Sequence, residues 1–487
     1  MSKPSAPSIP PVAGVPVLLL AALSVAVSQT IVVAALPVFS RTDGVSATTA
    51  TWLLTIFMLA SAVMTPIAGR LGDLHGHRRV MVAGLLLLGT GSVVAAIGDL
   101  TGWFPGLLLG RVLQGCSGGV FPAVFGLARG SLSPRRLHGV VAALSATFGI
   151  GGALGMVVAG PLVDLVGTSW LFWISLLMAG ACLAGTPLLT EDSHRRSSGE
   201  HDRLDVGGAV LLATTLVALL LGISQGRTWG WVSPATVTAF ATAVVLGVIF
   251  VLAEARATAP MIDLGLLVRP ALAGTNLATV VISIGMFAAV TLIPRFAQAT
   301  SGYGFGYTPT QTGLMLVPTA ALMVVAAPAA TRLSRATSSR TTFQIGALLA
   351  CLALVVFALA NAHAWEFYLG GAVLGIAYGL AFASLGGLVV GAVSHEQTGA
   401  ATGINTILRT LGGALGAQLA AVILVGSAGA DQVPTRGGYV LAFLVSAAVA
   451  LVALATAAAI GHHPLATASS PSATPVPGSS TGDGVDG

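Results

Sequence analysis

Arg111 and Arg409 each stand inside a stretch of otherwise apolar residues. If such a stretch crosses a lipid bilayer, the charge costs roughly 3 kcal/mol or more, and a charge kept at that cost usually faces a water-filled cavity or pairs with another group. Gln114 follows Arg111 by three residues, which places both near one face of a helix. These residue types predict a polar site in a membrane-embedded cavity, with a structural ion pair inside a helix bundle as the alternative.

The sixteen carboxylates lie elsewhere, at or beyond the ends of the apolar stretches, and the nine His residues lie in loops or at stretch ends. If the predicted cavity serves proton-coupled transport, it needs a group that titrates while it is exposed to each side of the membrane in turn, as a desolvated carboxylate does. Proton coupling would therefore use a boundary carboxylate such as Asp73 or Asp164, or a relay through Arg111. The alternative is a facilitator or another driving force. Without a carboxylate at mid-depth, a lipophilic, neutral or anionic substrate is favoured, and the two arginines favour an anion.

The composition identifies the class of protein that must position these residues. Hydrophobic residues make up 55% of the 487-residue chain, charged residues only 8%, and the mean hydropathy is +0.93, whereas soluble domains carry about a quarter charged residues. An all-α integral membrane protein is therefore predicted. A span needs about 20 apolar residues, and fourteen spans are predicted at 15–38, 50–69, 80–98, 104–127, 139–163, 169–189, 206–225, 233–253, 272–293, 310–330, 342–360, 366–390, 399–425 and 438–460. Residues 1–13 and 462–487, rich in Pro, Ser, Thr and Gly, are predicted to be disordered tails.

Basic residues and tryptophans predict the orientation. With the N-terminus in the cytoplasm, fifteen of the 21 basic residues fall in inside loops: Lys3, Arg70, Arg78, Arg79, Arg129, Arg135, Arg136, Arg195, Arg196, Arg203, Arg256, Arg269, Arg332, Arg335 and Arg340. All seven Trp residues then fall at the outer boundary, where aromatic belts lie. We expect a plasma-membrane protein with both termini in the cytoplasm.

The segment Gly69–Val80 joins two predicted spans and combines glycines with one carboxylate and three arginines. Such a segment cannot lie inside a bilayer, so a short loop is predicted, in which Asp and Arg can pair. It resembles the loop signature of the major facilitator superfamily of transporters at Gly69, Leu71, Asp73, Gly76 and Arg78. The resemblance implies a clasp on the cytoplasmic side formed by Gly69, Asp73, Gly76, Arg78 and Arg79, with Asp73 and Arg78 stabilising one state.

The two halves of the chain repeat each other. At an offset of 262 residues Pro66 and Arg70 meet Pro328 and Arg332, and at an offset of 261 the segment 151–155 repeats as 412–416. Two six-helix bundles with two inserted helices are therefore predicted, an arrangement that resembles the fourteen-helix drug–proton antiporter branch of the superfamily. The predicted domains are an N-terminal bundle over 14–190, a linker with the inserted helices over 191–268 and a C-terminal bundle over 269–461.

A fourth-span motif supports the resemblance. Arg111, Gln114 and Gly115 match the family's fourth-helix motif, and the resemblance implies that the arginine takes part in proton relay or in the response to substrate. Gln114 could line the cavity or bond a neighbouring helix. Gly115 is expected to allow close helix packing.

A fifth-span motif matches in part. Gly151, Gly155 and Gly160 follow the small-residue spacing of the family's antiporter motif, but Met156 stands where that motif has proline. The spacing permits close approach of helices. Ordinary helix packing, without a dedicated antiport role, is the alternative.

The first span resembles the branch's first-helix motif, except that Ser28 stands where the motif begins with Asp, a proton-binding candidate in relatives. Asn405 and Arg409 share a helix face in the thirteenth span. They predict a polar stripe on a cavity wall, or else an arginine that reaches back to the cytoplasmic surface. The candidate cavity-lining residues are Ser28, Thr30, Phe57, Met58, Asn405 and Arg409, and Phe125, Met286 and Phe287 suit a bulky apolar molecule or core packing equally well.

These patterns predict a secondary active transporter that exports a small lipophilic compound by alternating access, as the resemblance to multidrug efflux proteins implies. An uncoupled facilitator or an exporter of an anionic or lipid-like metabolite is the alternative, and a transporter-derived sensor or scaffold is an alternative of another class. The sequence has no metal-binding, catalytic or nucleotide-loop motif, so no enzyme activity and no cofactor are predicted. The expected partners are the substrate, the lipid bilayer and protons as a coupling ion, without nucleic acid, and the chain is expected to be a monomer.

Overall fold

The computed structural model describes residues 14–36, 38–39, 44–45, 47–189, 205–257, 265, 269–300, 302–393, 398–428 and 434–459. Every regular element in these residues is a helix. Thirteen helical segments are long and apolar enough to cross a membrane, and the shorter apolar helix α1 (Gly14–Thr30) precedes them. The predicted all-α membrane fold is confirmed over the described residues, where thirteen of the fourteen predicted spans correspond to membrane-length helices and the first corresponds to the shorter α1. The predicted tails lie outside these residues.

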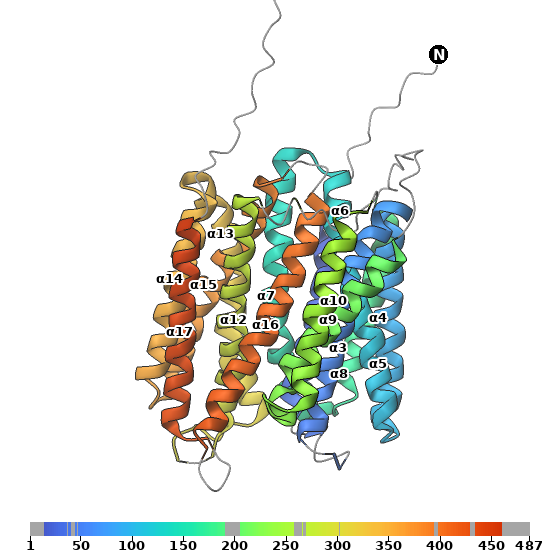
Figure 1. Ribbon diagram of the computed structural model, residues 1–487. Helices are drawn as coiled ribbons and strands as arrows, with labels where there is room; N and C mark the ends of the chain where they lie inside the picture. Colours follow the sequence, from blue (N-terminus) through green and yellow to red (C-terminus); the bar gives the residue numbers. More distant parts are fainter. Residues whose placement is uncertain are drawn as a thin grey trace, which may run out of the picture.

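The helices after α1 run roughly side by side across the molecule (Figure 1). They are α3 (Ala47–His75), α4 (His77–Leu100), α5 (Phe104–Cys116), α6 (Val120–Ser131), α7 (Pro134–Val166), α8 (Trp170–Gly185), α9 (Val206–Trp229), α10 (Pro234–Glu254), α12 (Pro270–Gln298), α13 (Pro309–Ala336), α14 (Ser339–Leu359), α15 (Ala364–Gly391), α16 (Thr398–Gly426) and α17 (Arg436–Ala459). Short 3₁₀ helices lie at Val33–Ala35, Ser117–Gly119 and Thr186–Leu188. The second of these joins α5 to α6, so the two helices make one crossing.

Two predicted boundaries were wrong. The segment predicted as a loop, Gly69–Val80, is helical on both sides of Gly76. Gly76 alone leaves the helix, with φ 97° and ψ 131°, a backbone conformation that a residue without a Cβ adopts most easily. The first span, predicted to reach residue 38, ends as an α-helix at Thr30 and continues in turns and a 3₁₀ helix.

Successive crossings alternate in direction, so Gly14 and Ala459 lie at the same end of the molecule, the upper end in Figure 1. We call this the tail end and the opposite end the far end. The junction at Gly76 lies at the tail end, and the ends of α7 and α8 that meet near Gly167 lie at the far end.

The helices α1 to α8 form an N-bundle and α12 to α17 a C-bundle. The glycines that repeat between the halves allow two helices to approach closely in each bundle. An added Cβ at Gly151 or Gly155 of α7 would collide with α1, and one at Gly412 or Gly416 of α16 would collide with α12. The sequence repeat therefore corresponds to two equivalent close helix pairs, each between a bundle's first and fifth crossings.

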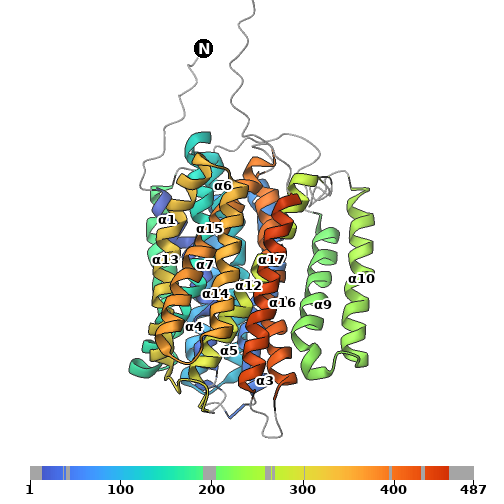
Figure 2. The same cartoon turned by 90° about the vertical axis from the view of Figure 1, so that its left-hand side faces the viewer.

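The inserted helices α9 and α10 stand beside the two bundles rather than between them (Figure 2). α9 contacts α3 of the N-bundle and α16 of the C-bundle. α10 packs mainly on α9 and exposes Val244, Val248 and Leu252 on its outer side. An apolar exposed face of this kind suits lipid as its surroundings.

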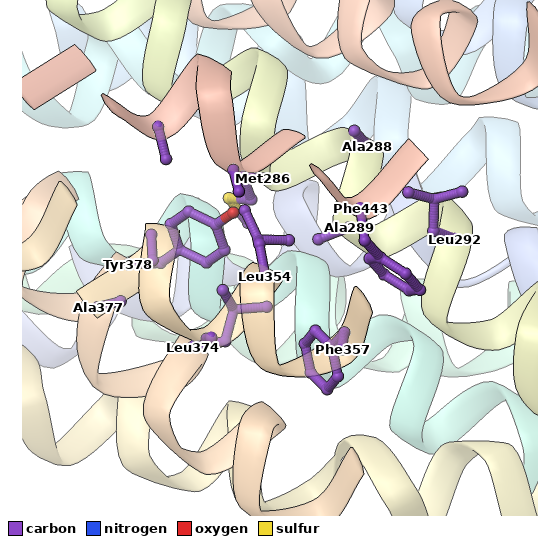
Figure 3. Packing of buried hydrophobic residues seen from close by; sticks show 14 of the residues in the cluster. Met286, Ala288, Ala289, Leu292, Leu354, Phe357, Leu374, Ala377, Tyr378 and Phe443 are labelled. Atoms are coloured by element: carbon purple, nitrogen blue, oxygen red, sulfur yellow. The ribbon is translucent and has the colours of Figure 1, made fainter. Parts of the chain in front are cut away.

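The C-bundle has an aromatic and aliphatic core. Figure 3 shows Leu354, Phe357 and Phe443 packed together, with Leu374 nearby. Ring centres of Phe357 and Phe443 lie 5.5 Å apart, within the usual range for aromatic pairs. This rigid core leaves the faces of α12, α13, α15 and α16 to position the residues at the bundle interface.

Candidate functional site

Arg111 is enclosed by the N-bundle. Its side chain is fully buried, its Nε donates to the Leu53 carbonyl at 2.8 Å, and its Nη1 donates to the Ser28 carbonyl and to Gln114 Oε1, both at 2.8 Å. The guanidinium Cζ lies 4.5 Å from the centre of the Phe57 ring. Ser28 is in the last turn of α1, where carbonyls lack helical partners. A single arginine thus joins α1, α3 and α5.

Neutral groups hold the Arg111 charge. None of the ion pairs in the described part of the chain involves it. The alternative of a structural ion pair is therefore not what this structure shows, and neither is a charge on an open cavity wall. Its Nη2 atom is buried without a hydrogen-bond partner, which leaves one donor for another group.

Gln114 extends the network to α4. Its Nε2 donates to Ser92 Oγ at 2.8 Å, so the glutamine bonds a neighbouring helix, one of its two predicted roles. The Ser28 hydroxyl points elsewhere and donates to Ser175 Oγ of α8 at 2.9 Å. Thr30 is buried against Gly155 and lies 3.5 Å, through its Oγ1, from the Gly151 carbonyl. Ser28 and Thr30 therefore pack within the N-bundle in this conformation.

Arg409 differs from Arg111 because it crosses between the bundles. Its side chain is 4% exposed, and its Nη1 donates to the Ser145 carbonyl of α7 at 3.1 Å. Its Cζ lies 5.0 Å from the ring centre of Phe148 in α7 and 4.8 Å from that of Phe382 in α15. The arginine does not extend to the tail-end surface, so the structure places it at the bundle interface.

Asn405 lies one turn from Arg409 and faces α12. Its Nδ2 donates to Thr279 Oγ1 at 2.7 Å and to Asn276 Oδ1 at 3.2 Å. The predicted polar stripe on α16 is therefore divided between two partners. Asn405 joins two helices of the C-bundle, whereas Arg409 joins the C-bundle to α7.

Asp164 makes the second contact between the bundles, at the far end. Its Oδ2 accepts from the Thr310 amide at 3.2 Å and also from the Thr310 hydroxyl. Thr310 is in the first turn of α13, where free amides and the helix dipole favour a carboxylate. An added Cβ at Gly160, one turn earlier in α7, would lie 2.5 Å from the Pro309 carbonyl. The two bundles therefore meet closely at this end.

Asp73 lies at the tail end, where α3, α4 and α6 meet. Its Oδ1 is 3.3 Å from His77 Nε2 and 3.6 Å from Arg129 Nη2. The His77 ring lies between Gly72 and Gly126, where an added Cβ would collide with it. Sequence reasoning missed His77 and Arg129. The two glycines that make room for the ring were the available signal, but they stand 54 residues apart in the chain.

Other predicted site residues have packing roles here. Gly69 lies against Pro122 of α6, and a Cβ at Gly115 would lie 2.5 Å from the Phe57 carbonyl. Phe57 is buried beneath Arg111, while Met58 packs with the cluster that joins α3, α9 and α16. Arg78 and Arg79 lie in the first turn of α4, at the tail end.

The chain resembles known transport proteins along most of its length. A family model described as the Major Facilitator Superfamily matches residues 18–417 and 275–480. A tetracenomycin C resistance and export protein of Streptomyces glaucescens is 28% identical over 85% of this chain and 76% of its own length. A puromycin resistance protein of Streptomyces alboniger is 28% identical, with 86% and 82% covered, and a multidrug resistance protein B homolog of Mycobacterium tuberculosis is 26% identical, with 84% and 75% covered.

A solved structure supports the fold. The human organic anion transporter MFSD10 (TETRAN) superposes with a TM-score of 0.64 over 91% of this chain and 98% of its own, at 17% sequence identity. At that identity the likeness concerns the fold alone. The family model, which covers more than half of the sequence, the fourteen apolar helices and this superposition agree. The chain therefore belongs to the Major Facilitator Superfamily of transporters.

Proposed function

We propose that this protein exports small lipophilic compounds by alternating access. The observation that carries the proposal is its likeness to three resistance proteins, one of them named as an export protein, over more than four-fifths of the chain. In this family the two bundles rock about a central site and open it to each side in turn. Likeness to these resistance proteins over more than four-fifths of the chain supports a transporter rather than a sensor or scaffold.

Two interbundle contacts suit such rocking. Asp164 and Thr310 join α7 to α13 at the far end, whereas Arg409 and Ser145 join α16 to α7 nearer the tail end. Opening toward either side separates the bundles at that side first, so each contact would break in a different step. Both contacts are made in the conformation described here.

We propose that the protein lies in the plasma membrane with its tail end facing the cytoplasm. The excess of basic residues in loops at that end supports it. Reporter fusions after residue 230 are expected to be active outside the cell, and fusions after residue 461 inside. The opposite pattern would require the molecule to be inverted in the membrane.

Protons are the proposed coupling ion, with a boundary carboxylate as the site. Among the described residues the carboxylates are Asp73, Asp99, Asp164, Asp205, Glu254 and Glu366. Each lies at or next to a helix end rather than at mid-depth. Asp164 accepts hydrogen bonds that join the two bundles, so it is well placed to link a protonation event to their separation.

Efflux measurements test the proposal. Cells that express the chain are loaded with a panel of neutral, anionic and cationic lipophilic compounds, and retention is compared with that of cells carrying the empty vector, with and without an uncoupler. We expect lower retention of at least one compound class and a rise toward the control when the proton gradient is collapsed. Equal retention in both cell types for the whole panel would contradict export.

A further inference from the structure

Arg409 carries a positive charge at the bundle interface. Its only hydrogen bond in the described part of the chain is to a main-chain carbonyl, that of Ser145. No carboxylate pairs with it there, and its Nε atom is buried without a partner. Two aromatic faces, Phe148 and Phe382, offset part of the cost of burial. An arginine that keeps an unfilled donor and no counter-charge suits an anionic guest.

Two further polar groups without partners lie inside the C-bundle. The Tyr378 hydroxyl and Ser283 Oγ are both buried without a hydrogen bond. The Tyr378 ring centre is 6.2 Å from that of Phe382, and Ser283 lies against Gly412, about one helical turn after Arg409. Figure 3 shows the Tyr378 hydroxyl beside Met286. Unsatisfied buried polar groups are uncommon in folded proteins and call for an explanation.

Two methionines of the C-bundle contact α7 near Arg409. Met286 and Met323 meet the face of α7 at Gly149, where an added Cβ would lie 3.4 Å from Met286 Cε and would collide with Met323. Methionine side chains adapt to irregular apolar guests and contact aromatic rings favourably. The interface near Arg409 thus combines one cation, two aromatic rings and flexible sulfur atoms, and the unfilled hydroxyls lie in the adjoining C-bundle.

We infer that Arg409 binds the negative group of an aromatic anion, whose rings pack on Phe148, Phe382 and the methionines. The inference rests on the proposed export function and names the class of its substrate. When α7 moves away from α16, the bond to Ser145 breaks and the guanidinium turns both Nη1 and Nε toward the opening between the bundles. A sulfonate or carboxylate oxygen then replaces the carbonyl and fills the donor that this conformation leaves empty.

A matched pair of fluorescent probes tests this inference. Anilinonaphthalenesulfonate carries one sulfonate, and N-phenylnaphthylamine has the same aromatic frame without it. Binding of each probe to the purified full-length protein in lipid nanodiscs is measured by fluorescence titration, with empty nanodiscs subtracted. The native protein is expected to bind the sulfonate more tightly than the neutral probe.

Substitutions at Arg409 and at the neighbouring Thr410 test whether Arg409 recognises the sulfonate or only supports the structure. Arg409→Gln is expected to weaken sulfonate binding by about tenfold or more, the range for hydrogen bonds to a charged group, and to change neutral-probe binding by less than about twofold. Arg409→Lys, which keeps the charge but loses Nε, is expected to retain part of the preference. Thr410→Val is the control, because its hydroxyl bonds only within α16, and both probes are expected to bind as in the native protein.

Two outcomes would overturn the inference. One is an equal loss of both probes in Arg409→Gln and Arg409→Lys, which would make the arginine a structural link. The other is a native protein without preference for the sulfonate. If that protein still exports a neutral compound from cells, the export function stands and only the assignment of an anion is lost.

Discussion

Arg111 shows how a buried arginine can be stabilised without a carboxylate. Two main-chain carbonyls and one amide oxygen accept from it, and Phe57 covers one face. Arg111→Met fills similar volume but leaves these acceptors unsatisfied. We expect a net loss of about 2–4 kcal/mol of stability, since the lost bonds outweigh the removed cost of burying the charge. Thermal unfolding of the purified protein in detergent measures this loss.

A control on α1 isolates the main-chain contribution. Ser28→Ala removes the hydroxyl bond to Ser175 but keeps the carbonyl that accepts from Arg111. It is therefore expected to cost about 1 kcal/mol, as for one neutral hydrogen bond. If both variants unfold at the same temperature, the network around Arg111 contributes little and a role in transport becomes its main explanation.

Asp73 carries the second prediction at the residue scale. Its carboxylate faces His77 and Arg129, and its side chain is 43% exposed, so Asp73→Asn is expected to change stability by less than about 1 kcal/mol. Transport is expected to fall by about tenfold, because the junction of α3, α4 and α6 loses a charge that favours one arrangement of these helices. Efflux and expression are measured together. Asp73→Glu should restore much of the rate, and unchanged efflux in the Asn variant would assign the junction a role in topology alone.

Sequence reasoning located the polar residues but not their partners. Arg111 and Gln114 could be singled out because charge and amide groups are rare in apolar spans. Their acceptors could not, since the carbonyls of Ser28 and Leu53 belong to the backbone and carry no side-chain signature. The same reason explains why Arg409 was recognised as unusual while its contact with Ser145 was not.

At the scale of elements, glycines decide how closely α7 approaches its neighbours. A Cβ at Gly160 would lie 2.5 Å from the Pro309 carbonyl and 2.9 Å from Thr310 Cα, both backbone atoms that cannot turn aside. Gly160→Ala is therefore expected to push α7 from α13 at the far end and to destabilise this conformation by about 1–3 kcal/mol. Thermal unfolding and efflux together measure the change.

Gly180→Ala is the matched control within a helix. Gly180 of α8 has open space around its Cα, so the added methyl group is expected to leave stability unchanged or to raise it by about 0.5–1 kcal/mol through helix propensity. An equal loss of stability in both variants would indicate that the close approach of α7 and α13 at the far end does not stabilise this conformation.

Helices were easier to predict than their ends. Apolar runs identified the crossings because the bilayer demands them, and the repeated segments indicated two equivalent bundles. The end of α3 was wrong because Arg70 and Asp73 read as loop residues, although a helix can continue beyond the apolar layer with its polar side chains in water. The early end of α1 coincides with the Arg111 contact to Ser28, a tertiary interaction that no local pattern contains.

At the scale of the whole molecule, some buried charged groups hold one bundle together and others join the two bundles. Arg111 ties helices of one bundle together, whereas Arg409 and Asp164 join the two bundles at different heights. The inserted α9 touches both bundles at α3 and α16. If the bundles rock, the network around Arg111 can stay intact while the contacts of Arg409 and Asp164 break in turn. The free energy that drives transport must therefore change the contacts at the bundle interface.

In the proposed function a proton gradient supplies that free energy. The first-helix motif that this chain resembles begins with Asp, but this chain has Ser28, and a serine does not titrate near neutral pH. We expect substrate flux in proteoliposomes to depend on an imposed pH gradient less steeply than in relatives with that carboxylate. Ser28→Asp adds a carboxylate to the residue whose main-chain carbonyl accepts from Arg111, at the buried position from which the native hydroxyl donates to Ser175.

The variant is expected to steepen the dependence of flux on the pH gradient, because a buried carboxylate can take up and release a proton, which serine cannot do. Ser28→Asn is the matched control, since it has the same shape but no titrating group. Asp164→Asn tests the boundary carboxylate that joins the bundles. Steep gradient-driven accumulation by the native protein that survives Asp164→Asn and Asp73→Asn would show that protons enter through a group other than these two carboxylates.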